Sequence, residues 1–218
     1  ELRPYQLRGY QWITAQTQWG FGLCLADDMG LGKTLQAAAW LLQQWETNVL
    51  DQPALVVCPT TLLANWAKEL ERFTPDLRVQ VYHGSDRQLG IADVVITTYG
   101  LLRNDKELQD RHWHAVILDE AQNIKNPAAH QTRAVKRLHT KHRLALTGTP
   151  VENALVELWS IFDFLNPGFL GSRRSFTESF ARPIESGQNI AKTEQLQRMV
   201  GPFLLRRMKT DRSVITDL

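Results

Sequence analysis

A loop that could bind phosphate lies near the start of the chain. Residues 27–34 read Asp-Asp-Met-Gly-Leu-Gly-Lys-Thr, after an apolar run at 21–26 that we predict to be a buried strand. An alanine-rich stretch of high helix propensity begins at Leu35. This order of strand, turn and helix places backbone N–H groups at a helix N-terminus, where they can hold a phosphate chain. Lys33 would then reach the β- and γ-phosphates, and the Thr34 hydroxyl would bind Mg²⁺.

The loop departs from the general G-x-x-x-x-G-K-[ST] pattern at one position. Asp27 stands where that pattern has its first glycine, so a chance match is the alternative interpretation. A second acidic motif argues against chance. Asp119 and Glu120 directly follow the apolar stretch 114–118. The first carboxylate can hold Mg²⁺, and the second can orient or deprotonate an attacking water. An ordinary acidic turn is the alternative interpretation of Asp119 and Glu120, but the two motifs together predict hydrolysis of ATP or GTP.

The stretches around these motifs alternate between strand and helix. We predict strands at 21–26, 53–59, 78–83, 92–99, 114–118 and 143–146, and helices at 4–19, 35–47, 60–73 and 128–140. This alternation predicts an α/β fold with a doubly wound, mostly parallel sheet. Ligands bind at the carboxyl ends of the strands in such sheets. The polar clusters 27–34, 119–122 and 147–150 should therefore converge on one edge.

The pattern becomes helical from residue 154 onward. We predict helices at 154–166, 172–181 and 191–200, with breaks at Pro167-Gly168 and around Pro183. These helices would form a small appendage to the sheet domain. Residues 171–218 hold nine Lys or Arg against five Asp or Glu, a charge of +4, which leaves −2 of the total +2 for the rest. A basic portion can meet phosphates, although solvated helix faces explain the charge equally well.

The bulk properties exclude several classes of protein. No apolar run approaches membrane-spanning length, and no signal peptide opens the chain. Cys24 and Cys58 both fall in predicted strands, so we expect core residues in a reducing compartment and no disulfide or metal site. The 218 residues start and stop abruptly, so we expect them to be part of a longer protein.

Several motifs together resemble the first motor lobe of the Swi/Snf family, double-stranded DNA translocases among the superfamily-two helicase-like ATPases. The matching segments follow the family's order along nearly the whole chain: 2–6 with Gly9 and Trp12, 27–34, 58–66, 97–100, 119–122, 124–126, 146–150 and 202–207. Asp27 matches the acid of the family's phosphate loop. Gln122 departs from the family, which usually has His there, and this bears on coupling to a second lobe.

The resemblance implies a RecA-like P-loop three-layer sandwich. It divides the chain into a lobe core at 1–153, a helical extension at 154–205 and the start of a connection to a second lobe at 206–218. It also implies an ATP-dependent double-stranded DNA translocase that uses ATP and Mg²⁺ and yields ADP and phosphate. A second lobe of the same polypeptide would supply arginine fingers, so we expect this portion alone to be weakly active or inactive.

The resemblance also assigns roles to individual residues. Catalysis falls to Lys33, Asp119 and Glu120; metal binding to Thr34 and Asp119; nucleotide binding to Gln6, Asp27, Asp28, Met29, Gly30, Leu31, Gly32, Lys33 and Thr34; coupling to Gln122, Thr147, Gly148 and Thr149; and DNA binding to Thr60, Thr61, Thr97, Thr98, Tyr99 and Lys125. The Gln6 amide can bond the Hoogsteen edge of adenine. Arg206 and Arg207 either contact phosphate or brace the second lobe.

Two other functions remain open from the residues. The chain could be a nucleotide-dependent protein-docking module with residues 154–200 as its surface, or, more remotely, a P-loop kinase of small molecules. For a motor, a protein on the DNA is a further partner. We expect a cytoplasmic, nucleoid-associated location in a prokaryote and a nuclear one in a eukaryote.

Overall fold

The computed structural model describes residues 1–85, 87–148, 155–187 and 189–216. At its centre these residues form a seven-stranded sheet of order β3-β4-β2-β5-β6-β1-β7, and every pair of neighbouring strands is parallel. The strands are β1 (Leu23–Leu25), β2 (Ala54–Cys58), β3 (Val79–Val81), β4 (Val94–Thr98), β5 (His112–Leu118), β6 (His139–Leu146) and β7 (Leu204–Leu205). The predicted α/β fold with a parallel sheet is confirmed.

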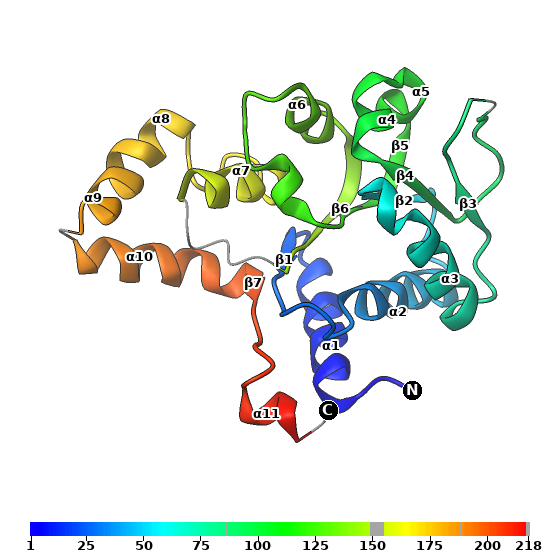
Figure 1. Cartoon of the computed structure of the whole chain (residues 1–218), viewed down its shortest axis with the longest axis horizontal. Helices are drawn as coiled ribbons and strands as arrows, with labels where there is room; N and C mark the ends of the chain where they lie inside the picture. The colour runs from blue at the N-terminus through cyan, green and yellow to red at the C-terminus, as the bar shows by residue number, and fades with distance from the viewer. Residues whose placement is uncertain (86, 149–154, 188, 217–218) are drawn as a thin grey trace.

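Helices cover both faces of this sheet (Figure 1). They are α1 (Pro4–Thr17), α2 (Lys33–Glu46), α3 (Leu63–Phe73), α4 (Tyr99–Asn104), α5 (Lys106–Asp110), α6 (His130–Lys136), α7 (Leu155–Leu165), α8 (Arg173–Phe176), α9 (Arg182–Glu185), α10 (Ile190–Val200) and α11 (Arg212–Ile215). Helix α2 packs between α1 and α3 on one face, and α6 contacts α4 and α7 on the other. Because both faces are covered, β1, β2 and β4 are buried at every residue, as the unbroken apolar sequences of β1 and β2 predict.

Two predicted boundaries in the sequence are wrong. The helix expected at 128–140 ends at Lys136, and the strand expected at Arg143 already begins at His139. The cause is pairing with β5, because His139 and Thr140 lie in register with His112 and Trp113. Local helix propensity is overridden there by the hydrogen bonds of the sheet.

The predicted break around Pro183 is also wrong. Helical structure continues from α8 through a π-helical turn at Thr177–Ala181 into α9, where Pro183 lies in the first turn. A proline ring clashes with the carbonyl group of the preceding turn in a regular α-helix. The wider π turn accommodates the ring, and the helix therefore continues to Glu185.

The C-terminal part of the chain returns to the sheet. Strand β7 pairs with β1, with Leu204 and Leu205 opposite Cys24 and Leu25. Helices α8, α9 and α10 project from this end of the molecule as a separate group (Figure 1). The range predicted to be a helical extension therefore ends in a strand of the main sheet. The division of the chain at residue 153 stays a prediction.

Both cysteines are core residues. Cys24 and Cys58 are buried and form no disulfide, and burial raises the pKa of each thiol to about 12. Within the described ranges, His, Cys, Asp and Glu side chains form no cluster of three or more that could hold a metal ion. None of the helices that the structure describes is both long and apolar enough to span a bilayer.

Four histidines gather near the amino ends of β5 and β6. The rings of His112 and His139 stack with centroids 5.2 Å apart, and those of His114 and His142 lie 5.1 Å apart. Nδ1 of His114 lies 3.0 Å from a carboxylate oxygen of Asp51. Burial lowers the pKa of His142 to about 4, and it also lowers the pKa of His114 despite the opposing effect of Asp51.

This histidine group predicts loss of stability in mild acid. A folded-state pKa below the ordinary value of 6.5 disfavours protonation, so the rings' contribution to stability is complete above pH 6.5 and is lost as the pH falls toward 4. We expect the free energy of unfolding, measured with urea, to fall by about 1–2 kcal/mol. This loss is smaller than the lowering of the His142 pKa implies, because solvent partly screens the ring. His142→Phe should flatten this profile, whereas His83→Gln, at an exposed position, should not. An unchanged profile in His142→Phe would contradict the assignment.

Candidate active site

The phosphate loop joins β1 to α2 and has the backbone that anion binding requires. Gly30 and Gly32 have φ values of +84° and +77°, which a side chain would strain. Gly32 is the N-cap of α2 and provides no side-chain acceptor for the first N–H groups of the helix. These N–H groups and the positive end of the helix dipole are therefore available to an anion.

Lys33 places its ammonium group over this loop. Its Nζ donates hydrogen bonds to the carbonyl oxygens of Asp27 at 2.6 Å and Asp28 at 3.3 Å. Burial lowers the pKa of Lys33, while the nearby carboxylates of Asp27, Glu120, Asp119 and Asp28 act in the opposite direction. The loop and the acidic motif therefore meet around one cation, as predicted. Thr34 is the second residue of α2 and is half-buried.

Gln6 reaches the phosphate loop from α1. Its Nε2 donates to the carbonyl oxygen of Leu31 at 3.3 Å, and its Oε1 accepts from the backbone N–H of Arg3 at 3.0 Å. A Cβ atom at Gly32 would lie only 2.4 Å from Nε2 of Gln6. Gln6 thus lies beside the nucleotide-binding loop, and its role in reading adenine stays a prediction.

The acidic pair follows β5 at the same sheet edge. Asp119 is buried; its Oδ2 accepts from the indole N–H of Trp66 at 2.7 Å, and its Oδ1 accepts from the backbone N–H of Glu120 at 2.9 Å. Burial raises the pKa of Asp119, and these two hydrogen bonds oppose the rise. Glu120 has φ +50°, a left-handed conformation that is uncommon for a residue other than glycine. Strain of this kind is concentrated at functional sites.

A hydrogen-bonded chain connects the acidic pair to the end of β6. Nε2 of Gln122 donates to a carboxylate oxygen of Glu120 at 2.7 Å, and its Oε1 accepts from the Thr147 hydroxyl at 3.0 Å. A Cβ atom at Gly148 would lie 3.6 Å from Nζ of Lys33. Gln122, Thr147 and Gly148 therefore lie together at the site. Thr149, predicted with them, lies outside the described residues.

The residues predicted to bind DNA divide into two groups. Thr60, Thr61 and Lys125 are exposed, and Nζ of Lys125 lies 3.3 Å from a carboxylate oxygen of Glu157. The other three have buried side chains with partners inside the lobe. The Thr97 hydroxyl donates to the Tyr82 carbonyl, Thr98 caps α4, and the Tyr99 hydroxyl donates to the Asp119 carbonyl. Their side chains thus position the sheet edge and do not face solvent.

Sequence reasoning did not identify two residues of the site. Trp66 is a buried core residue, and its indole N–H also donates to Asp119, a contact that no local spacing reveals. Arg207 was expected to contact phosphate or to brace the second lobe, yet it is buried against Asp27. The sequence does contain a signal for the pair of Asp27 and Arg207, because a carboxylate that directly follows a buried strand needs a cationic partner.

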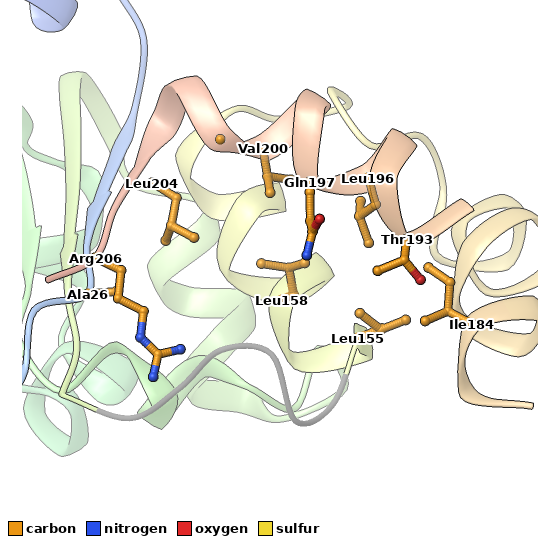
Figure 2. A pocket seen from close by; sticks show the side chains of 11 residues that line it. Ala26, Leu155, Leu158, Ile184, Thr193, Leu196, Gln197, Val200, Leu204 and Arg206 are labelled. Carbon is orange, nitrogen blue, oxygen red and sulfur yellow. The ribbon is translucent and has the colours of Figure 1, made fainter. Parts of the chain in front are cut away.

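A separate apolar hollow of about 320 Å³ lies between α7, α10 and β7. Figure 2 shows Leu155, Leu158, Leu196 and Val200 around it, with the Arg206 side chain at one end. Lys33, Asp119 and Glu120 do not line it. The hollow is therefore distinct from the polar site at the sheet edge.

The fold and site together define a P-loop ATPase lobe, and comparison with known proteins identifies its family. The family model of the SNF2-related domain matches residues 5–215. The chain belongs to this family of helicase-like ATPases, with the RecA-like fold of the family's N-terminal lobe.

Individual relatives support the same assignment. The chain is 47% identical over 226 residues to YwqA of Bacillus subtilis, whose name gives it as a candidate ATP-dependent helicase/translocase; the match covers 100% of this chain and 24% of that protein. It is 40% identical over 248 residues to the TATA-binding protein-associated factor mot1 of Aspergillus fumigatus, covering 100% and 13%. The SWI2/SNF2 ATPase core of Sulfolobus solfataricus in complex with dsDNA superposes with a TM-score of 0.95 at 49% identity, covering 100% of this chain and 47% of that one. The chain thus spans under half the length of these relatives.

Proposed function

We propose that this chain is the ATP-binding N-terminal lobe of a motor that moves along double-stranded DNA. The observation that carries the proposal is the convergence of Lys33, at the start of α2, with Asp119 and Glu120, which follow β5. Gln122 joins Glu120 to Thr147. A nucleotide-binding loop alone is shared by many enzymes. A motor must also respond to the state of its nucleotide, and the hydrogen-bonded link from Glu120 through Gln122 to Thr147 would provide such a connection.

The side chains of the site suit ATP with Mg²⁺. The triphosphate would lie on the N-terminus of α2 and on Lys33, with Gln6 beside the adenine. Thr34 and Asp119 would hold Mg²⁺, which prefers oxygen ligands of this kind. When bound, the ion neutralises negative charge on the phosphates. Glu120 would orient the attacking water and accept its proton, and hydrolysis would yield ADP and phosphate.

The expected DNA contacts are independent of base sequence. The exposed hydroxyls of Thr60 and Thr61 and the Lys125 ammonium can bind backbone phosphates, and phosphate contacts carry no sequence information directly. The 97–99 segment would contribute by holding this edge of the sheet in place. The related ATPase core of Sulfolobus solfataricus forms a complex with dsDNA, which supports a duplex as the partner.

A second lobe of the same polypeptide would complete the catalytic site. An arginine supplied from outside a P-loop lobe is worth about 10³–10⁵ in rate. This chain alone should therefore bind MgATP and hydrolyse it slowly. The complete protein should hydrolyse ATP faster with duplex DNA present.

Measuring ATP hydrolysis by the complete protein with and without duplex DNA tests the proposal. Stimulation by duplex DNA of unrelated sequences is the expected result. No stimulation by any nucleic acid would overturn the motor and favour a nucleotide-dependent docking module. The apolar hollow beside α10 is the observation that favours this second candidate.

Gln122→Ala should reduce this stimulation. The change removes the donor to the Glu120 carboxylate and the acceptor of the Thr147 hydroxyl, and a hydrogen bond to a charged group contributes about 1.5–3 kcal/mol. We expect DNA-stimulated hydrolysis to fall by about 10- to 100-fold, with MgATP binding retained. Gln122→His, which keeps a donor and an acceptor, should restore most of it. Equal rates in Gln122→Ala and the unaltered protein would contradict a coupling role.

A further inference from the structure

The residues that follow β7 run beside the start of the phosphate loop. The backbone N–H of Ala26 donates to the Leu205 carbonyl at 2.7 Å, and that of Asp28 donates to the Arg207 carbonyl at 3.0 Å. The backbone N–H of Lys209 donates to a carboxylate oxygen of Asp28 at 2.9 Å. Pairing between the two segments therefore continues past the sheet into the loop itself. Figure 1 shows this segment descending from β7 to α11 near the N-terminus.

Arg207 lies at the centre of this contact. Its side chain is buried, as is that of Asp27. Nε donates to Oδ1 of Asp27 at 3.0 Å, Nη2 donates to Oδ2, and the Arg207 backbone N–H also donates to Oδ1 at 3.0 Å. Such a bidentate pair of guanidinium and carboxylate fixes both position and orientation. Nη1 of Arg207 further donates to the Tyr5 carbonyl in α1.

Gln36 extends the contact of Arg207 to the far end of the loop. Nη2 of Arg207 donates to Oε1 of Gln36 at 2.7 Å, and Nε2 of Gln36 donates to the Gly32 carbonyl at 3.1 Å. Arg207 thus holds the loop at its first residue through Asp27 and at its last glycine through Gln36. Gly9 makes room for this arrangement, because a Cβ atom there would lie 1.9 Å from Oε1 of Gln36 and 2.7 Å from Nη2 of Arg207.

The acid at the first position of the loop is explained by the same contact. Among the described residues other than glycine, only Asn48 and Glu120 have positive φ, so Asp27 does not need the backbone freedom of glycine. Its side chain is instead the acceptor for Arg207. The neighbouring Arg206 side chain lies at one end of the apolar hollow.

We propose that Arg207 is a positioning residue of the nucleotide site, which couples the phosphate loop to residues 204–209. Arg207 fixes the loop for phosphate binding, and bound nucleotide in turn orders the 204–209 segment, because coupling between two sites is reciprocal. The nucleotide half of this inference rests on the proposed function. The segment lies where the chain is predicted to continue toward a second lobe, so the same contact would report the state of the nucleotide to that lobe.

Arg207→Lys in this chain tests the positioning role. Lysine keeps the positive charge but cannot make the bidentate pair and bond Gln36 as well. Without nucleotide, we expect the backbone amides of residues 28–34 to exchange hydrogen at least about tenfold faster, and MgADP affinity measured by calorimetry to fall about tenfold. Arg143→Lys is the matched control: Arg143 is half-buried and donates to the Phe164 and Leu138 carbonyls. It should change neither quantity.

A second variant tests the same connection if Arg207→Lys fails to fold. Gln36→Met keeps the buried ion pair of Asp27 and Arg207 and a similar side-chain volume. It removes the acceptor for Nη2 of Arg207 and the donor to the Leu31 and Gly32 carbonyls, so the connection from Arg207 to the end of the loop is lost. It should also speed exchange at residues 28–34. In the unaltered chain, MgADP should slow exchange at 204–209.

Each outcome bears on a different part of the inference. If Arg207→Lys lowers the melting temperature but leaves exchange at 28–34 and MgADP affinity unchanged, Arg207 is only structural and the proposal is overturned. If MgADP binds without slowing exchange at 204–209, the coupling is overturned. Failure of the unaltered chain to bind MgADP would overturn the proposed function, whereas the exchange measured without nucleotide still decides the positioning role.

Discussion

Glu120→Gln should lower DNA-stimulated ATP hydrolysis by at least about 100-fold in the complete protein, because general base catalysis contributes about 10²–10⁴ in rate. Glutamine has nearly the shape of glutamate but cannot accept the proton of an attacking water. The Lys33 ammonium, the N-terminus of α2 and Asp119 are unchanged by this substitution, so MgATP binding should persist. Steady-state hydrolysis with saturating duplex DNA, together with equilibrium binding of MgATP, measures the two effects separately.

The matched control for Glu120→Gln is Glu71→Gln, which makes the same chemical change on an exposed part of α3. Its hydrolysis rate should equal that of the unaltered protein. A Glu120→Gln protein that keeps more than a third of the rate would show that Glu120 is not the group that serves the water. Loss of MgATP binding in Glu120→Gln would mean instead that the carboxylate holds the nucleotide complex together.

Trp66→Ala should lower the free energy of unfolding of this chain by about 3–5 kcal/mol, the usual cost of removing a buried tryptophan. Trp66 is fully buried in α3, and its indole N–H donates to Asp119 across the sheet edge. The total stability of a domain is about 5–15 kcal/mol, so this loss is a large share of it. Urea unfolding followed by circular dichroism measures the change.

Trp66→Phe separates packing from the hydrogen bond. Phenylalanine fills much of the same space but leaves Oδ2 of Asp119 without its donor, at a cost of about 1–3 kcal/mol. Trp45→Ala, at a more exposed position in α2, is the control and should cost less than about 1.5 kcal/mol. Equal losses in Trp66→Ala and Trp45→Ala would contradict the assignment of Trp66 to the core.

Local sequence was sufficient to predict β1 to β6 in order and the sheet edge where the polar clusters meet, but it did not predict β7. Apolar runs such as Ala54–Cys58 indicate strands covered on both faces, and parallel strands bring their carboxyl ends together. Lys33, Asp119 and Thr147 therefore had to meet once the strands were recognised. Element boundaries were less accurate: β6 begins four residues earlier than expected, at His139, because β5 offers its hydrogen-bonding groups there.

The phosphate loop shows which information is local and which depends on the tertiary structure. Its glycines, Lys33 and the following helix are encoded in eight consecutive residues, because backbone conformation and helix start depend on near neighbours. The partner of Asp27 is Arg207, 180 positions along the chain, and local spacing cannot predict such a contact. The hydroxyls of Thr97 and Tyr99 likewise face inward only because other strands and loops cover them. Residue types and local order thus determined the possible chemistry, and long-range packing decided which groups are buried, paired or presented to a ligand.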